Sequence, residues 1–530
     1  MDISSSQPGA ETTNIPGPKG PDLKGRGRGI VTRLLHGAGA GTIAYGLGIA
    51  SNLLLLPLYL RVWSVAKYGE WMALYSAVNY LANLDFGITF AAINAATIAY
   101  ACKDWQTFKR VQGTAWMASL MIAGIGSVFV IGLSLFHFPL GRWLGLTVFT
   151  RRDTLLVFCG LSLSLLANIP GRQLIAVYIA IGEFAKYQWA WNAFSLMLCI
   201  ATAIALILNA SPVLLTGVIV ATTVATISIA WELLRRRDSR LIPDLRDSDW
   251  RTARELAMPT GQIGISMIAS ALTVQGPVIV LSRMLGGPAV ALFTTTRTVT
   301  NLVRGTVTLV RAPLRPELAA ASTHSDHDSL HRLFRIAVSV DTVAAISFSA
   351  VLWSGGEWFI RLWSHGHIMP DLLLLRLLLI VVVVEGFLQA LASPGWATNQ
   401  IKALSVSLLV TAVISVLLTI LLVGRFGPSA APLGALIPLI AIMTPVTLLN
   451  ACKEARLPMR FVAVRMLLPF IAIALFSAAL PALLVDLHIG PQWLSAALSS
   501  MTVCAVAVLV CGSFSLTSSD RRSVRNRLNS

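Results

Sequence analysis

Three arginines recur at seven-residue intervals inside one apolar stretch: Arg297, Arg304 and Arg311. Seven residues return an α-helix to nearly the same face, with a drift of about 20°. The guanidiniums are therefore predicted to form one stripe about 21 Å long, at 1.5 Å per residue. A guanidinium is always charged, and its planar fork matches phosphate oxygens. The spacing favours a track for an anionic group such as phosphate. The alternative is that the outer arginines extend toward water and only one is buried.

Two more charged residues interrupt apolar stretches. Arg172 follows a Pro-Gly pair that loosens a helix, and we expect it to join the same cavity as the stripe or to extend toward the nearer surface. Asp85 begins an Asp-Phe-Gly sequence in the middle of another stretch. Three hypotheses remain open for Asp85: it pairs with an arginine, binds a coupling cation or marks a helix break.

Glu385 is the best remaining candidate for a counter-charge to the arginines or for a proton carrier, while Asp341 and Arg376 are weaker candidates. No Ser/His/Asp, paired-carboxylate or phosphate-loop pattern accompanies these residues, so we expect a non-enzyme without cofactor or direct use of ATP. The six cysteines include no C-x-x-C pair and lie in or beside apolar runs. Neither a metal site nor a disulfide framework is therefore expected.

The composition identifies the elements that carry these residues. Of 530 residues, 55% are hydrophobic and only 12% are charged, whereas a soluble domain has roughly 25% charged residues. This excludes a soluble enzyme, a fibrous protein and a disordered scaffold. Because the apolar runs are much longer than barrel strands, we predict an all-α polytopic membrane protein. The net charge of +17 then indicates contact with membrane lipids and not with nucleic acid.

About fourteen apolar stretches are long enough to cross a membrane, which takes about 20 residues. They cover 37–60, 71–99, 112–137, 154–181, 187–208, 212–234, 257–281, 288–312, 334–352, 372–395, 403–423, 431–450, 461–485 and 493–513. The weakest divisions are the long second stretch and the short turn between the fifth and sixth. Residues 1–36 are rich in Pro, Gly and Ser and are predicted to form a disordered tail; residues 514–530 form a second tail.

An internal repeat organises the stretches. Residues 73–84 and 291–302 both begin with Ala-Leu and end with Asn-Leu, which pairs the second stretch with the eighth. An offset of six stretches keeps both halves in the same orientation, as in parallel-repeat transporters. We therefore predict two six-helix bundles, 37–234 and 257–450, joined by a cytoplasmic linker at 235–256. Helices 13 and 14, within 451–513, are an addition.

The distribution of basic residues predicts the orientation. Segments on the side of the N-terminus hold more than three times as many Lys and Arg as those on the opposite side. Basic residues accumulate in cytoplasmic loops. Both termini are therefore expected in the cytoplasm.

Short motifs near the first helices and in the eighth resemble a known family. The first group is Pro57-Leu58-Tyr59-Leu60-Arg61, Tyr68-Gly69-Glu70-Trp71, Asp85-Phe86-Gly87 and Asn94. The second is the Ala-Leu-Phe-Thr-Thr-Thr-Arg run at 291–297, followed by Pro316-Glu317. Together they resemble bacterial polysaccharide flippases, which move O-antigen and exopolysaccharide units and belong to the multidrug/oligosaccharidyl-lipid/polysaccharide exporter superfamily. The good matches cover residues 40–110 and 285–320.

The resemblance implies a central cavity with alternating access, in the bacterial inner membrane. It implies an undecaprenyl-diphosphate-linked oligosaccharide as substrate, used for surface polysaccharide biosynthesis, including the O-antigen of lipopolysaccharide. Other polysaccharide-assembly proteins are implied as possible partners. Helices 13 and 14 resemble the two that shape a groove for the lipid tail in related lipid II flippases.

Three other functions compete with this interpretation. A drug or small-solute antiporter of the same fold would favour acidic sites, and the first apolar stretch, 37–60, contains no carboxylate. A membrane glycan polymerase or ligase usually needs a large outside loop, whereas the longest one expected, at about 353–371, is short. A scaffold without transport does not explain arginines in mid-membrane.

Overall fold

The computed structural model describes residues 43–44, 46–136, 138–311, 327–397, 402–455, 457–486 and 492–511. Throughout these residues the regular structure is helical, and no strand occurs in them. The all-α class predicted from the composition is confirmed. The predicted tails at 1–36 and 514–530 lie outside the described residues, as does Pro316-Glu317.

The first helices run from residue 46 to the charged linker. They are Gly46–Val62, α2 (Val65–Asn79), α3 (Ile88–Ala101), α4 (Trp105–Leu135), the short α5 (Leu140–Leu144), α6 (Arg151–Ala180), α7 (Phe184–Ile207) and α8 (Pro212–Arg237). Side-chain caps mark several of their starts: the side chains of Ser64, Asp104, Thr150 and Ser211 each accept a hydrogen bond from a first-turn backbone N–H. Such caps satisfy backbone donors that have no partner within the helix.

The remaining helices begin after the linker. They are α9 (Trp250–Leu285), α10 (Gly287–Arg311), α12 (His327–Trp363), α13 (Leu372–Leu391), α14 (Ser393–Ala397), α15 (Lys402–Phe426), α16 (Ala430–Pro438), α17 (Thr444–Glu454), α18 (Met459–Val462), α19 (Leu468–Asp486) and α20 (Gln492–Val510). A π-helical turn, η5 (Leu439–Met443), joins α16 to α17.

Nine helical segments in the described residues are long and apolar enough to cross a membrane. One of them, Lys402–Glu454, contains both the eleventh and the twelfth predicted stretches. Three shorter apolar helices, Gly46–Val62, Ile88–Ala101 and Leu498–Val510, accompany them. The chain is a multi-pass membrane protein. The turn predicted between the fifth and sixth stretches is also present, between α7 and α8.

The second predicted stretch is wrong as a single helix. The chain leaves α2 after Asn79 and enters α3 only at Ile88. Phe86 and Gly87 between them have φ values of 48° and 88°, in the left-handed region that ends a helix. Asp85 stabilises this turn, because its Oδ1 accepts a hydrogen bond from the N–H of Gly87 at 3.3 Å. The break predicted as one alternative for Asp85 is therefore present.

The predicted linker is shorter than 235–256, because α8 extends to Arg237 and α9 begins at Trp250. Its backbone rests on α4: the Thr114 hydroxyl accepts a hydrogen bond from the N–H of Asp249 at 3.0 Å. Asp249 also caps α9, and hydrogen bonds from Thr252 hold the pKa of the Asp249 carboxyl below its usual value. The linker is thus folded onto the first half of the chain.

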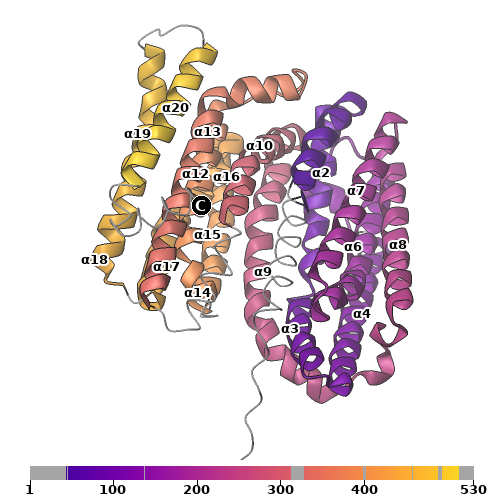
Figure 1. Ribbon diagram of the computed structural model, residues 1–530. Helices are drawn as coiled ribbons and strands as arrows, with labels where there is room; N and C mark the ends of the chain where they lie inside the picture. The colour runs from indigo at the N-terminus through magenta and orange to yellow at the C-terminus, as the bar shows by residue number, and fades with distance from the viewer. Residues whose placement is uncertain are drawn as a thin grey trace, which may run out of the picture.

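Figure 1 shows the arrangement of the helices: α3, α4 and α6–α8 form one side of the molecule, α12–α20 form the other, and α9 and α10 stand between them. α19 and α20 lie at the outer edge of the second side. They pack on α12 through a buried cluster that includes Phe334, Ile346, Phe470 and Val503. This apolar packing gives α10 a fixed support on α12 and α13.

Candidate substrate cavity

A cavity of about 800 Å³ lies among α9, α10, α13, α15 and α16. Its lining comes from these helices, from Ser393 of α14 and from the turn η5, and no described residue of α2–α8 contributes to it. The volume lies within the range of about 300–1,000 Å³ typical of small-molecule sites. The charged lining residues are Arg297, Arg304, Arg311 and Glu385. Three cations face one anion, so the described lining carries a net positive charge.

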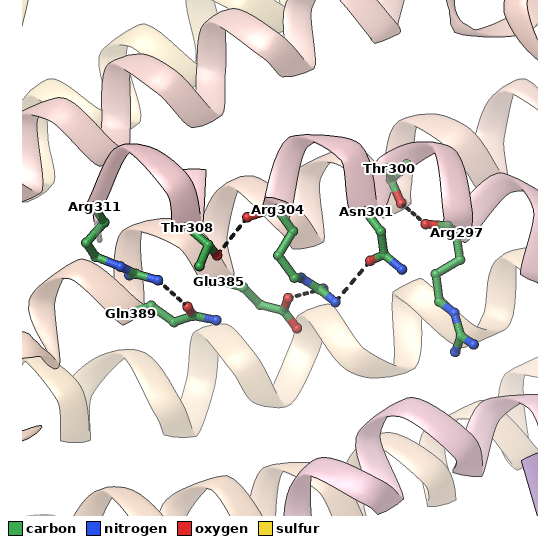
Figure 2. A network of polar contacts seen from close by, with 8 residues as sticks. All are labelled: Arg297, Thr300, Asn301, Arg304, Thr308, Arg311, Glu385 and Gln389. Atoms are coloured by element: carbon green, nitrogen blue, oxygen red, sulfur yellow. Dashed lines mark hydrogen bonds and ion pairs between the residues drawn. The ribbon is translucent and has the colours of Figure 1, made fainter. Parts of the chain in front are cut away.

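The three arginines of α10 point into the cavity in one row. Figure 2 shows them about two turns apart on the same side of α10, with Arg304 and Arg311 reaching Glu385 and Gln389 on the facing helix. The seven-residue spacing thus produces the single stripe that the sequence predicted. The three guanidiniums differ, however, in what they contact.

Arg297 contacts none of the carboxylates that the structure describes. Its Nη1 donates to the carbonyl oxygen of Val274 on α9 at 2.6 Å, and its guanidinium lies 5.2 Å from the centre of the Phe293 ring. Arg297 forms no ion pair within the part of the chain that the structure describes. The guanidinium of such an arginine keeps hydrogen-bond donors and a positive charge that suit an anion.

Arg304 occupies the middle of the row and is paired. Its Nη2 donates to Glu385 Oε2 of α13, and its Nη1 donates to Asn301 Oδ1 at 3.1 Å. The side chains of Arg304 and Glu385 are 38% and 20% exposed. Both side chains therefore border the cavity, where another anion can compete for the guanidinium.

Arg311 lies at the end of the row that is most shielded from water. Its Nη1 lies 3.2 Å from Asp341 Oδ2 of α12, and its Nη2 donates to Gln389 Oε1 at 2.8 Å. The two charged side chains are 4% and 0% exposed. Removing one partner of such a buried pair leaves an uncompensated charge, which costs roughly 3–5 kcal/mol. This pair fastens α10 to α12.

Arg172 does not line the cavity. It lies on α6, where its Nη2 donates to the carbonyl oxygen of Ala82 at 2.9 Å and approaches Asp85 Oδ2 to 3.8 Å. Arg172 was expected either to join the cavity or to extend toward the nearer surface, and neither expectation describes its contacts. Its partners come from the break in the second stretch. Asp85 pairs with an arginine and also forms the helix break. Asp85 and Arg172 together brace the turn between α2 and α3.

Hydroxyl groups line the wall of the cavity beside the row. Ser266, Ser270 and Thr273 follow each other along α9, and Ser405 of α15 joins them. The Ser270 and Thr273 hydroxyls donate to carbonyl oxygens four residues earlier, and Ser266 donates to Ser405 Oγ at 2.7 Å. Because these protons are used within the protein, the Ser270 and Thr273 oxygens present acceptors to the cavity. Guanidinium donors and hydroxyl acceptors thus border the same space.

One end of the molecule is closed by backbone contacts between α2 and α10. A Cβ atom on Gly69 would lie 1.8 Å from the carbonyl oxygen of Gly287, so only glycine permits this approach. Beside it, Ser282 donates to the carbonyl oxygen of Leu144 at 2.6 Å. Gly69 and Gly287 occupy equivalent positions in the aligned repeat. Two repeats related by a rotation axis that runs between them bring equivalent residues together near that axis.

Glu70 gives the Tyr-Gly-Glu-Trp motif a structural role. Its fully buried carboxylate accepts backbone N–H bonds from Thr147 at 2.6 Å, Val148 at 2.8 Å and Phe149 at 2.9 Å, and the Thr147 hydroxyl at 3.0 Å. These bonds satisfy the buried charge and hold the loop before α6 against α2. Glu70 therefore shapes the closed end and lies outside the cavity.

Sequence reasoning missed several residues of the site. Asn301 and Gln389 contact the arginines but are common side chains without a charge signal. The helical spacing from Glu385 to Gln389 places both on one face, and that signal could have identified Gln389. Asp341 was only a weaker candidate in the sequence, because its partner, Arg311, lies on another helix. No cluster of three or more metal-ligating side chains occurs in the described residues.

Comparison with solved structures identifies the class of fold. An inward-facing multidrug resistance MATE transporter of the MOP superfamily is similar over 77% of this chain and 95% of its own, with 14% identity and a TM-score of 0.66. The lipid II flippase MurJ, in an inward closed conformation, covers 88% of this chain and 98% of its own, with 14% identity and a TM-score of 0.65.

A MOP superfamily transporter from Pyrococcus furiosus, described as having a binding pocket of reversed polarity, has 13% identity and a TM-score of 0.61. It covers 80% of this chain and 95% of its own. No family model and no curated protein matches the chain in sequence. The chain has the fold of the MOP superfamily transporters, and the resemblance seen in the motifs is confirmed at that level.

Proposed function

We propose that this protein is a flippase that carries an undecaprenyl-diphosphate-linked oligosaccharide across the bacterial inner membrane for surface polysaccharide biosynthesis. The observation that carries the proposal is the arginine row on the wall of the cavity, in which Arg297 contacts no carboxylate of the described residues. A diphosphate that crosses a membrane loses its hydration unless cationic donors replace it. Guanidiniums at successive depths supply those donors.

The hydroxyl wall supports a glycan as the attached group. A sugar hydroxyl donates hydrogen bonds as well as accepting them, and the Ser270 and Thr273 oxygens are available acceptors. At about 800 Å³ the cavity suits a ligand of small-molecule size. It would therefore hold the diphosphate and the first sugars, while the remaining glycan and the lipid tail extend outside.

The proposed orientation gives the state of the transporter. With both termini in the cytoplasm, the end closed by Gly69, Gly287 and Ser282 faces outward. The cavity then receives substrate from the cytoplasmic side, where lipid-linked sugars are made. Separation of Gly69 from Gly287, with closure at the other end, would complete an alternating-access cycle.

The leading alternative, a drug or small-solute antiporter, shares the fold but fits the charge less well. Cationic drugs need acidic partners, and the single carboxylate that lines the described cavity, Glu385, is already paired with Arg304. A glycan polymerase or ligase is less favoured still, because α12 extends through much of the predicted outside loop and leaves only a short connection before α13.

Deletion of the gene in its host tests the proposal. We expect surface polysaccharide to be lost and the lipid-linked oligosaccharide to accumulate in the cytoplasmic leaflet, with both restored by the wild-type gene. Susceptibility to cationic drugs should not change. Normal surface polysaccharide together with raised drug susceptibility would instead establish the antiporter.

A further inference from the structure

Glu385 occupies the position at which a phosphate would bind Arg304. It comes from α13, reaches across to the guanidinium, and both side chains remain partly exposed to the cavity. Figure 2 shows the Glu385 carboxylate in the same row of contacts as Arg297 and Arg311. A carboxylate and a phosphate offer the same pair of oxygen acceptors to a guanidinium.

The three arginines form a graded series. Arg297 contacts only neutral groups, Arg304 contacts an exchangeable carboxylate, and Arg311 contacts a carboxylate sealed from water. An incoming diphosphate can therefore engage Arg297 directly, and it reaches Arg304 only by displacing Glu385. The Arg311 pair is too buried to exchange. The contacts thus distinguish one open, one competitive and one locked position along a single helix face.

We infer that Glu385 is a built-in competitor for the substrate's phosphate, and that its return to Arg304 promotes release. This inference rests on the proposed function and adds a specificity-determining residue to it. A carrier must bind its cargo firmly enough to accept it and weakly enough to release it. A carboxylate that exchanges with the cargo limits affinity without removing the cation that the cargo needs.

Charged residues near Glu385 come from α10, α12 and α13. α10 brings Arg297, Arg304 and Arg311, and α12 brings Asp341, which Arg311 holds. On α13 itself, Arg376 lies over the ring of Trp353, 5.3 Å from its centre. The described cavity residues of α14, α16 and η5 are uncharged. Arg304 is therefore the group on which removal of the Glu385 charge acts.

The test is calorimetric titration of inorganic pyrophosphate into the purified full-length protein at fixed ionic strength. We expect Glu385→Gln, which keeps an oxygen acceptor but removes the charge, to bind pyrophosphate about three- to tenfold more tightly than wild type. Glu385→Met, of similar size and also neutral, should show the same gain. A purely structural role for Glu385 would weaken binding in both variants.

The matched control is Glu357→Gln. Glu357 pairs with Arg361 on α12 at 2.9 Å, away from the cavity lining, so its loss changes the net charge equally and should leave the affinity unchanged. In an Arg304→Ala background the gain from Glu385→Gln should disappear. Persistence of the gain there, or an equal gain in Glu357→Gln, would overturn the competition.

Failure of the two proposals can be told apart. If wild type binds pyrophosphate and the neutral Glu385 variants bind it equally or less tightly, the competitor role is wrong and the flippase proposal stands. If folded wild type and Glu385→Gln both fail to bind pyrophosphate, the anion track itself is wrong, and the proposed function falls with it.

Discussion

At the scale of single residues, the arginine row combines two kinds of chemistry on one helix face. Arg297 and Arg304 meet the cavity with exchangeable or neutral partners, whereas the pair formed by Arg311 and Asp341 is sealed. A sealed pair contributes little net stability compared with apolar residues, but it is costly to break. It therefore fixes the depth and rotation of α10, on which the other two arginines depend.

Asp341→Asn tests this structural role. The substitution removes the charge that faces the buried Arg311 guanidinium, so we expect the free energy of unfolding to fall by about 3–5 kcal/mol. The unfolding midpoint in detergent measures the loss. The double variant Arg311→Met/Asp341→Leu removes both charges and should unfold near the wild-type midpoint. An unchanged midpoint in Asp341→Asn would mean that the pair does not hold α10 in place.

The sequence predicted the face of the arginines but not their partners. A seven-residue spacing defines a helix face without any knowledge of neighbours, so the stripe of Arg297, Arg304 and Arg311 could be predicted. The partner of each arginine depends on how α12 and α13 dock on α10, which local spacing does not encode. For the same reason Arg172 was expected near the stripe or a membrane surface, while it lies beside Asp85.

At the scale of elements, the break between α2 and α3 is a turn of defined conformation that packs on α9. Gly87 adopts a φ of 88°, and a Cβ there would lie 2.7 Å from Ile263 Cγ2. The adjoining Phe86 carbonyl oxygen lies against Gly264 of α9. In the part of the chain that the structure describes, this turn is therefore one of the contacts between the first and second halves.

Gly87→Ala should disturb this turn. The left-handed conformation costs about 1–2 kcal/mol with a side chain, and the contact with Ile263 adds to that cost. We expect a lower unfolding midpoint and weaker transport. Gly124→Ala is the matched control, because Gly124 lies within α4 with nothing within 4 Å of an added Cβ, and it should stabilise by about 0.5–1 kcal/mol. Equal behaviour of the two variants would refute the strained turn.

Hydropathy identifies long apolar segments more readily than it identifies breaks within them. Asp85 is the only charged residue in the sequence of the second stretch. The division there depends on its side chain and on Phe86 and Gly87, which adopt positive φ values. Conversely, α10 is rich in threonine and arginine and is not among the nine described segments found by apolar length, although the sequence analysis counted 288–312 among the apolar stretches. Its packing against α12 and α13, not its hydropathy, makes it a central helix.

At the scale of the whole molecule, the closed end and the cavity share the helix α10. α10 begins at the contact between Gly69 and Gly287 and continues into the arginine row. A movement that separates α2 from α10 therefore also changes access to the row. The described cavity is lined by residues of the second half alone.

Topology reporters test the orientation on which this scheme depends. Fusions after Ser530 and near Asp244 should both score cytoplasmic, because basic residues accumulate on that side. A fusion near Leu146, beside the closed end, should score periplasmic. A periplasmic score at Ser530 or Asp244 would reverse the proposed direction of substrate entry.

The central claim is that the arginine row carries a diphosphate, and the rate at which proteoliposomes flip an undecaprenyl-diphosphate-linked sugar tests it most directly. Arg297→Ala should lower that rate at least about tenfold, which corresponds to about 1.4 kcal/mol, with normal insertion. Arg297→Lys should be intermediate, since it keeps the charge but loses the fork. Arg361→Ala, which breaks an exposed pair on α12, should flip at the wild-type rate. Wild-type flipping by Arg297→Ala and by Arg304→Ala would contradict the account.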